Sequence, residues 1–286
     1  MAWRPRPSDR FYRGIVRTGL ALRRLFRIRV IVTGQEHLPS PDPREATPGG
    51  SSRRAIPGRG AVVAITHFGY LDFAFAELLL WSHNKAQLRF LITQGAADHW
   101  FAGPAVSAAG LVVVGYGTGA HAYDAAVRKL RDGEYVAVLP EAGVSRSFRV
   151  RECKTGVVRM AAEAGVPIIP VSVWGSHRLM TRRMMTRRSG FSALRAWRAP
   201  VRVHVAEPMR VDPAQDPVAA TARLREVLQA GIDAGIADFP LHPRAGTWWM
   251  PSDLGGGAPS EAERQRMDAA EEPRRAGVRR AGGRRR

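Results

Sequence analysis

The sequence contains one cysteine, Cys153, among 286 residues. A single thiol excludes an internal disulfide and any metal site built from several cysteines, and it suits a reducing compartment. The chain also lacks a run of about 18 apolar residues, so a conventional membrane-spanning helix is not expected. Its N-terminus has neither the unbroken apolar segment nor the small-residue cleavage site of a secretory signal. With 45% hydrophobic residues, the sequence predicts a globular protein that buries a sizeable core.

Acidic residues are scarce, because 25 Asp and Glu oppose 44 Lys and Arg, which leaves a formal net charge of +19. Such an excess implies an anionic partner, which can be a nucleic acid, an anionic membrane face or a phosphorylated substrate. The charge is concentrated in two stretches. Residues 1–29 carry nine arginines against Asp9, and residues 171–198 carry seven arginines and no acid.

The first basic stretch has the pattern of an amphipathic helix over residues 9–26. One face carries Phe11, Ile15, Leu22, Leu25 and Phe26, and arginines occupy the remainder. Such a helix suits a membrane interface, with its apolar side down and its arginines among lipid phosphates. The alternative is a packing helix with a solvated arginine face. The arginines from Arg178 to Arg188, interleaved with leucine and methionine, leave the same choice open between bilayer contact and a solvated face.

Short apolar segments alternate with helix-like segments along most of the chain. Strands are predicted at 27–32, 61–65, 88–92, 111–114, 135–139, 168–173 and 201–206, and helices at 73–82, 96–109, 120–131, 154–164 and 213–237. This alternation predicts an α/β fold with a mostly parallel central sheet flanked by helices. We assign the segments as 1–29, basic and membrane-contacting; 30–240, one domain with a flexible insertion at about 40–60; and 247–286, a disordered basic tail.

A histidine follows the apolar strand at 61–65, and an aspartate stands five positions after it, at the start of a helix. Histidine can take and return a proton near neutral pH, and a carboxylate on its other ring nitrogen would hold the tautomer and stabilise the imidazolium. His67 and Asp72 are therefore candidate catalytic residues. Asp72 also suits the N-cap of the helix, so a purely structural role stays open.

The loop Leu139–Ser147 leaves another predicted strand, and loops at strand ends are where α/β proteins carry their sites. It offers the carboxylate of Glu141, a backbone free to approach a ligand at Gly143, and the guanidinium of Arg146. Positive charge continues through Arg149, Arg151 and Lys154. The alternative is a solvated charged turn.

In this order, the His-x4-Asp motif, the Pro-Glu-x-Gly loop with its downstream arginine and the segment Val166–Val171 resemble the glycerolipid acyltransferase family. That family includes the 1-acyl-sn-glycerol-3-phosphate acyltransferases. The similarity extends over about residues 30–208, and the Pro-Glu-Ala…Ser-Arg-Ser-Phe variant resembles an actinobacterial-type branch. The resemblance implies transfer of a fatty acyl group from acyl-CoA or acyl carrier protein to a lysophospholipid hydroxyl, in phospholipid biosynthesis or remodelling.

The resemblance also implies roles for single residues. His67 would be the general base and Asp72 its partner, and no metal or cofactor beyond the acyl donor would be needed. The substrate-binding residues would be Glu141, Gly143, Ser145, Arg146, Lys154 and Pro170. The enzyme would act at the cytoplasmic face of the plasma membrane as a peripheral or monotopic protein, with the anionic membrane surface as a partner.

Two positions depart from the family pattern. Thr66 stands where the family usually has asparagine, and Gly115-Tyr116 stands where it has an arginine linked to glycerol-phosphate binding. Arg146, Arg149 or Lys154 would then contact the acceptor phosphate, or the acceptor is another lipid or a sugar-linked hydroxyl. A nucleic-acid-binding protein and a catalytically degraded lipid-binding relative are further alternatives. No recognised nucleic-acid-binding signature is present, so no nucleic acid is expected as a partner.

Overall fold

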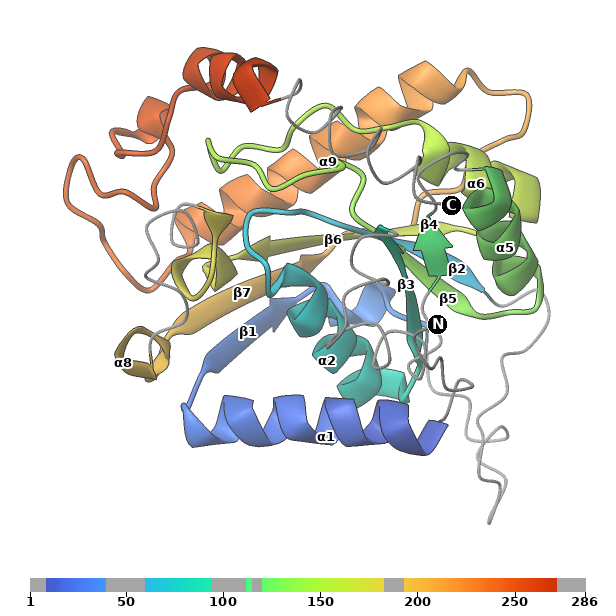
Figure 1. The fold of residues 1–286 in the computed structure, drawn as a ribbon, viewed down its shortest axis with the longest axis horizontal. Helices are drawn as coiled ribbons and strands as arrows, with labels where there is room; N and C mark the ends of the chain where they lie inside the picture. The colour runs from blue at the N-terminus through green and yellow to red at the C-terminus, as the bar shows by residue number, and fades with distance from the viewer. Residues whose placement is uncertain (1–8, 40–59, 94–111, 115–119, 183–192, 272–286) are drawn as a thin grey trace, which may run out of the picture.

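A seven-stranded sheet in the order β1-β7-β6-β2-β5-β3-β4 runs through the centre of the computed structural model (Figure 1). The structure describes residues 9–39, 60–93, 112–114, 120–182 and 193–271. The strands are β1 (Arg29–Thr33), β2 (Ala61–Ile65), β3 (Leu88–Thr93), β4 (Val112–Val114), β5 (Tyr135–Val138), β6 (Ile168–Trp174) and β7 (Pro200–Val205). Neighbouring strands are parallel except β6 and β7. The predicted α/β fold with a mostly parallel sheet is confirmed.

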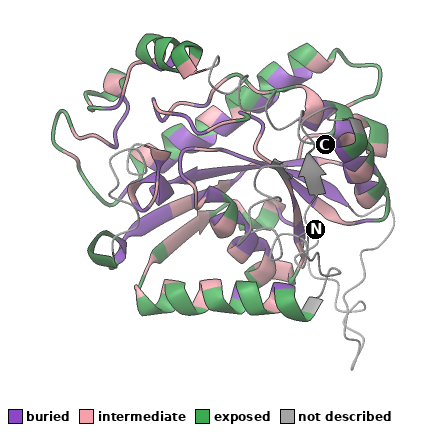
Figure 2. Ribbon diagram, viewed as in Figure 1, coloured by how far each residue is buried: buried purple, intermediate pink, exposed green. Residues whose placement is uncertain are grey.

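Helices cover both faces of this sheet (Figures 1 and 2). They are α1 (Asp9–Leu25), α2 (Asp72–Asn84), α5 (Ala120–Arg131), α6 (Gly156–Ala164), α8 (Ala193–Ala196) and α9 (Pro217–Ala237), with short 3-10 turns η1 (Gln35–His37), η3 (Ser176–Arg178) and η4 (Ser252–Leu254). Successive residues of a strand face opposite sides, so Val62 and Ala64 join the core that contains α6 and α9. Val63 and Ile65 join the core against α2. The predicted helix at 96–109 and all but the last residue of the predicted insertion at about 40–60 lie outside the described residues.

The N-terminal helix α1 packs on α2 through a stripe other than the predicted apolar face. Tyr12 and Val16 are buried against Leu78 and Trp81 of α2. Of the apolar side chains predicted to form one face, Phe11, Ile15, Leu22 and Leu25 are exposed, from 41% for Phe11 to 64% for Leu25, whereas Phe26 packs against the core beside α2. The amphipathic helix is therefore confirmed, and most of its predicted apolar face is exposed.

The segment 247–271 does not form the predicted disordered tail. It folds back over the core, includes η4, and is helical from residue 261 to 271. Trp249 anchors it, with its ring centroid 6.4 Å from that of Trp174 and 5.7 Å from that of Phe239. The prediction was wrong because isolated aromatic residues among glycines make no periodic pattern, although each buries a large apolar area. Residues 272–286 lie outside the described part of the chain.

Candidate functional site

Three loops meet where the parallel strands β2, β5 and β6 end, the edge at which α/β proteins bind ligands. These loops are residues 66–71, 139–155 and 175–182. Thr66, at the end of β2, accepts a hydrogen bond on its Oγ1 from the Val173 amide of β6 at 2.9 Å. The strand pairing therefore continues to the residue before His67, which fixes where the histidine leaves the sheet.

His67 and Asp72 lie together, as their spacing predicts. The distance from His67 Nδ1 to Asp72 Oδ2 is 3.8 Å, too long for a hydrogen bond but short enough for strong attraction between an imidazolium and a carboxylate. The His67 side chain keeps 13% of its surface exposed, whereas Asp72 is fully buried. His67 Nδ1 has no hydrogen-bond partner among the described residues. The pair is arranged so that Asp72 faces one ring nitrogen and leaves the other available.

The carboxylate of Asp72 is held by the loop that carries His67. Its Oδ2 accepts hydrogen bonds from the amides of Phe68 at 2.6 Å and Gly69 at 2.7 Å. The N-cap of α2 is Leu71, and Asp72 is the first helical residue. The predicted N-cap role of Asp72 is therefore wrong, because its side chain turns back to amides that precede the helix.

The segment after β6 supplies a residue that the sequence did not single out. The Ser176 hydroxyl donates to Asp72 Oδ1, and both side chains are fully buried. Gly175, in the left-handed region with φ 95°, turns the chain so that η3 begins at Ser176. In the sequence this stretch belongs to the basic run at 171–198, and only the Gly-Ser pair directly after a buried strand signals a turn at the site.

The same segment is locked to the loop that carries His67. Thr181 Oγ1 donates to the Phe68 carbonyl at 2.8 Å, and the Tyr70 amide donates to the Met180 carbonyl at 2.9 Å. A Cβ atom on Gly69 would lie 2.8 Å from the Cα of His177, so only glycine fits this approach. The geometry of His67 therefore depends on residues more than a hundred positions away in the chain.

The buried side chain of Glu141 links the loop at 66–71 to the loop at 139–155 by hydrogen bonds. Its Oε1 accepts the His67 amide at 2.6 Å, and its Oε2 accepts the Arg151 amide at 2.9 Å. Burial raises the pKa of Glu141 to about 7, and these two amides act in the opposite direction by stabilising the carboxylate. Since both oxygens are engaged with backbone, the contribution of Glu141 to the site is positional.

The other expected substrate-binding residues are less uniformly placed. The Ser145 amide donates to the His67 carbonyl at 2.8 Å, and its hydroxyl donates to the Arg149 carbonyl at 2.7 Å. A Cβ on Gly143 would meet the Arg151 guanidinium at 2.7 Å. Lys154 is exposed. Pro170 is buried within β6 opposite Ala64, in the interior of the sheet rather than at its edge.

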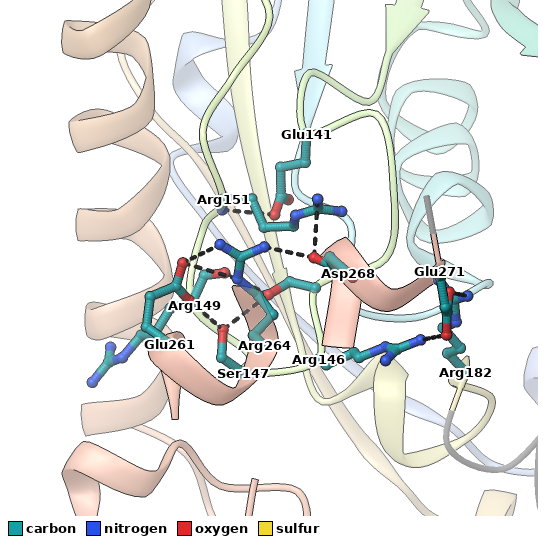
Figure 3. Close-up of polar contacts among 11 residues, drawn as sticks. Glu141, Arg146, Ser147, Arg149, Arg151, Arg182, Glu261, Arg264, Asp268 and Glu271 are labelled. Atoms are coloured by element: carbon teal, nitrogen blue, oxygen red, sulfur yellow. Dashed lines mark hydrogen bonds and ion pairs between the residues drawn. The ribbon is translucent and has the colours of Figure 1, made fainter. Parts of the chain in front are cut away.

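The arginines of this region are paired with carboxylates, most of which lie in the C-terminal segment (Figure 3). Arg146 and Arg182 both contact Glu271. Arg151 Nη2 lies 3.1 Å from Asp268 Oδ2, and Arg149 pairs with Asp233 of α9 and with Asp253. The expected positive patch is thus present, and four of its arginines form ion pairs within the chain.

Arg178 has a different surrounding from the predicted bilayer-facing or solvated position. Its guanidinium lies 4.7 Å from the ring centroid of Trp249 and 5.8 Å from that of Phe239, and Leu179 is fully buried. This part of the basic run therefore serves cation–π packing with the C-terminal segment. The arginines at 183, 187 and 188 lie outside the described residues.

Cysteine and metal chemistry find little support in the described part of the chain. Burial raises the pKa of the Cys153 thiol to about 12, which disfavours the nucleophilic thiolate. No group of three His, Cys, Asp or Glu side chains is placed to hold a metal ion among the described residues. The reactive group that the arrangement offers is the imidazole of His67.

Comparisons with known proteins bear on the family and the fold of the chain. Residues 29–174 match the family model described as Acyltransferase. Among solved structures, the chain is similar to a 1-acyl-sn-glycerophosphate (LPA) acyltransferase, PlsC, from Thermotoga maritima. The TM-score is 0.59 at 21% identity, over 80% of this chain and 81% of that chain. No curated protein gives a significant match to the sequence.

Proposed function

The chain belongs to the acyltransferase family, and from that premise we propose that it transfers a fatty acyl group from acyl-CoA or acyl carrier protein to a lysophospholipid hydroxyl. The proposed acceptor is a 1-acyl-glycerol 3-phosphate, acylated in phospholipid biosynthesis. The observation that carries the proposal is the buried Asp72 carboxylate 3.8 Å from His67 Nδ1, at the edge of the sheet where the loops meet. The fold it shares with the Thermotoga maritima LPA acyltransferase supports the choice of acceptor.

The proposed mechanism uses His67 as general base. Asp72 faces Nδ1, so Nε2 receives the proton of the acceptor hydroxyl while the hydroxyl oxygen attacks the thioester carbonyl carbon. The new C–O bond forms, the C–S bond breaks, and the proton passes from the imidazolium to the departing thiolate. Asp72 stabilises the imidazolium during this step. General-base assistance of this kind contributes about 10²–10⁴-fold to the rate.

The surface of α1 supports contact with a membrane. Its apolar side chains Phe11, Ile15, Leu22 and Leu25 are 41% to 64% exposed. A cavity of about 410 Å³ is lined by residues from α1, α2 and the segments that follow these helices, among them Arg23, Arg24, Arg27, Trp81 and Lys85. The positive charges that line this cavity would attract the phosphates of lipid headgroups, and its aromatic and aliphatic side chains would contact apolar parts of the lipid. We place the protein on the cytoplasmic face of the plasma membrane as a peripheral or monotopic enzyme. No helix among the described residues has the length and apolarity needed to cross a membrane.

The test is replacement of His67 by alanine. Purified protein is supplied with acyl-CoA and lysophosphatidate, and the diacyl product is identified by mass. We expect His67→Ala to reduce turnover by at least about 10²-fold, the lower end of what a general base contributes. His121→Ala, at an exposed position on α5, is the matched control and should keep full activity. Undiminished turnover in His67→Ala protein rules out the proposed mechanism.

A further inference from the structure

The two carboxylate oxygens of Asp72 have different partners. Oδ2, the oxygen that lies 3.8 Å from His67 Nδ1, accepts the amides of Phe68 and Gly69. Oδ1 accepts the hydroxyl of Ser176, and both of these side chains are fully buried. A buried carboxylate oxygen is costly to leave without a donor. The hydroxyl of Ser176 therefore stabilises the ionised side chain and favours the orientation in which Oδ2 faces the histidine.

The turn that carries Ser176 is held on both sides, so the position of the hydroxyl is fixed. Gly175 has a φ of 95°, and a Cβ atom there would lie 2.7 Å from the Pro200 carbonyl oxygen. The side chain of His177 is fully buried, and its Nε2 donates to the Trp249 carbonyl at 3.0 Å. The serine therefore meets the carboxylate from a rigid turn, which is what a supporting residue of a site requires.

The effect of Asp72 on the imidazolium depends on the distance between the two groups. If the nearest carboxylate oxygen moves from 3.8 Å to about 5 Å from His67 Nδ1, the weaker attraction at an effective dielectric constant of about 20 slows the reaction about sixfold. A misplacement of about 1 Å at a reacting group can cost up to about 10²-fold. A hydroxyl that prevents such a movement therefore contributes about tenfold or more to the rate.

We propose that Ser176 is a positioning residue for acyl transfer, because its hydroxyl holds Asp72 so that Oδ2 faces His67 Nδ1. This inference rests on the proposed function for the identity of the reaction. Ser176 is fully buried, so it acts through Asp72 rather than on the substrate. With the carboxylate held in this way, the proton of the neutral ring stays on Nδ1, and Nε2 is free to accept the proton of the acceptor hydroxyl.

The test is Ser176→Ala, assayed for kcat and KM with acyl-CoA and lysophosphatidate. We expect kcat to fall about tenfold or more with both KM values unchanged, because the lost interaction matters only as the imidazolium forms. Ser172→Ala is the matched control, since Ser172 is also buried and its hydroxyl donates to the Leu228 carbonyl at 2.8 Å. The control should lose stability in chemical denaturation and keep the kcat of the wild type.

A double-mutant cycle with Asp72→Asn separates positioning from a general effect on folding. Once the carboxylate is absent, Ser176→Ala should lower kcat by less than about twofold further, because the hydroxyl then has no charge to position. An equal loss in both backgrounds, or a wild-type kcat in the Ser176→Ala protein, overturns the proposal. Where the alanine variant does not fold, Ser176→Cys keeps a similar volume with a weaker donor and takes its place in the cycle.

A second readout needs no turnover. The tautomer of His67 is measured at alkaline pH by ¹⁵N NMR of the ring nitrogens, with His67→Ala to assign the signals. We expect the proton on Nδ1 in the wild type and in Ser172→Ala, and a mixture of the two tautomers in Ser176→Ala. An unchanged tautomer in Ser176→Ala overturns the proposal. If the tautomer responds but the wild type acylates no lysophospholipid, the proposed function fails while the positioning role stands.

Discussion

Replacing Asp72 by asparagine removes one charge from the site and leaves the shape of the side chain nearly unchanged. The carboxylate lies 3.8 Å from His67 Nδ1. Two unit charges at about that distance attract by about 4 kcal/mol at an effective dielectric constant of about 20. If this attraction is fully expressed when the imidazolium forms, its loss lowers the rate by about 10³-fold.

The same substitution has a smaller effect on stability. Asp72 accepts hydrogen bonds from two amides on Oδ2 and from the Ser176 hydroxyl on Oδ1. In asparagine the amide oxygen still accepts from the two backbone amides, each weakened by about 1 kcal/mol, and the NH2 group donates to the Ser176 hydroxyl oxygen. Relief from burying a charge offsets part of that loss. We therefore expect Asp72→Asn to lower the free energy of unfolding by about 1–2 kcal/mol, so the variant stays folded.

The assay follows thiol release from acyl-CoA in the presence of lysophosphatidate, and chemical denaturation gives the free energy of unfolding. Asp216→Asn is the matched control, because Asp216 also accepts two backbone amides at a helix start, those of Val218 and Ala219. It should lose stability and keep its turnover. Folded Asp72→Asn protein with turnover within about threefold of the wild type contradicts the electrostatic role, since a loss of about 4 kcal/mol cannot be hidden in that range.

Two further predictions concern pH and membranes. Burial raises the pKa of Glu77 to about 7, so the folded protein binds a proton that the unfolded chain releases near pH 4.5. Stability should therefore fall by up to about 3 kcal/mol as pH rises from about 4.5 to 7, and a Glu77→Gln variant that keeps the same slope in denaturation experiments contradicts this origin. Replacing Leu22 and Leu25 by serine should weaken binding to anionic vesicles in a flotation assay, whereas replacing exposed Leu254 should not; equal loss in both would deny α1 a special role.

Sequence patterns were sufficient for the sheet and for the centre of the site. Buried strands carry continuous apolar runs, and a histidine and an aspartate on either side of a strand-to-helix turn have few ways to lie far apart. The proximity of Glu141 to His67 follows from adjacent parallel strands ending at one edge. These relations are local or set by topology, which is why they can be predicted.

The remaining contacts of the site join residues that are far apart in the sequence, and they could not be predicted from local patterns. Nothing in the sequence around Ser176 distinguishes it from other serines, and its role depends on β6, which brings its hydroxyl to Asp72 Oδ1. The helix at 261–271 has a polar face without an apolar stripe, so its pattern resembles that of a solvated or disordered segment. Its partners are arginines more than 80 residues away, and the residue spacing within the segment does not predict these ion pairs. Hydrophobic periodicity cannot predict which side chains pair over long distances in the sequence.

The long-range hydrogen bonds that hold the loop carrying His67 also affect how the protein folds during synthesis. The loop is fixed by bonds from Ser145 and Thr181, and the segment of Thr181 is in turn covered by Trp249. A chain emerging from the ribosome can form β2 before the partners of the loop, which follow it in the sequence, have been synthesised. The base therefore acquires its geometry only after those later segments have folded, and a chain that lacks them presents a histidine without the surroundings that give it a role.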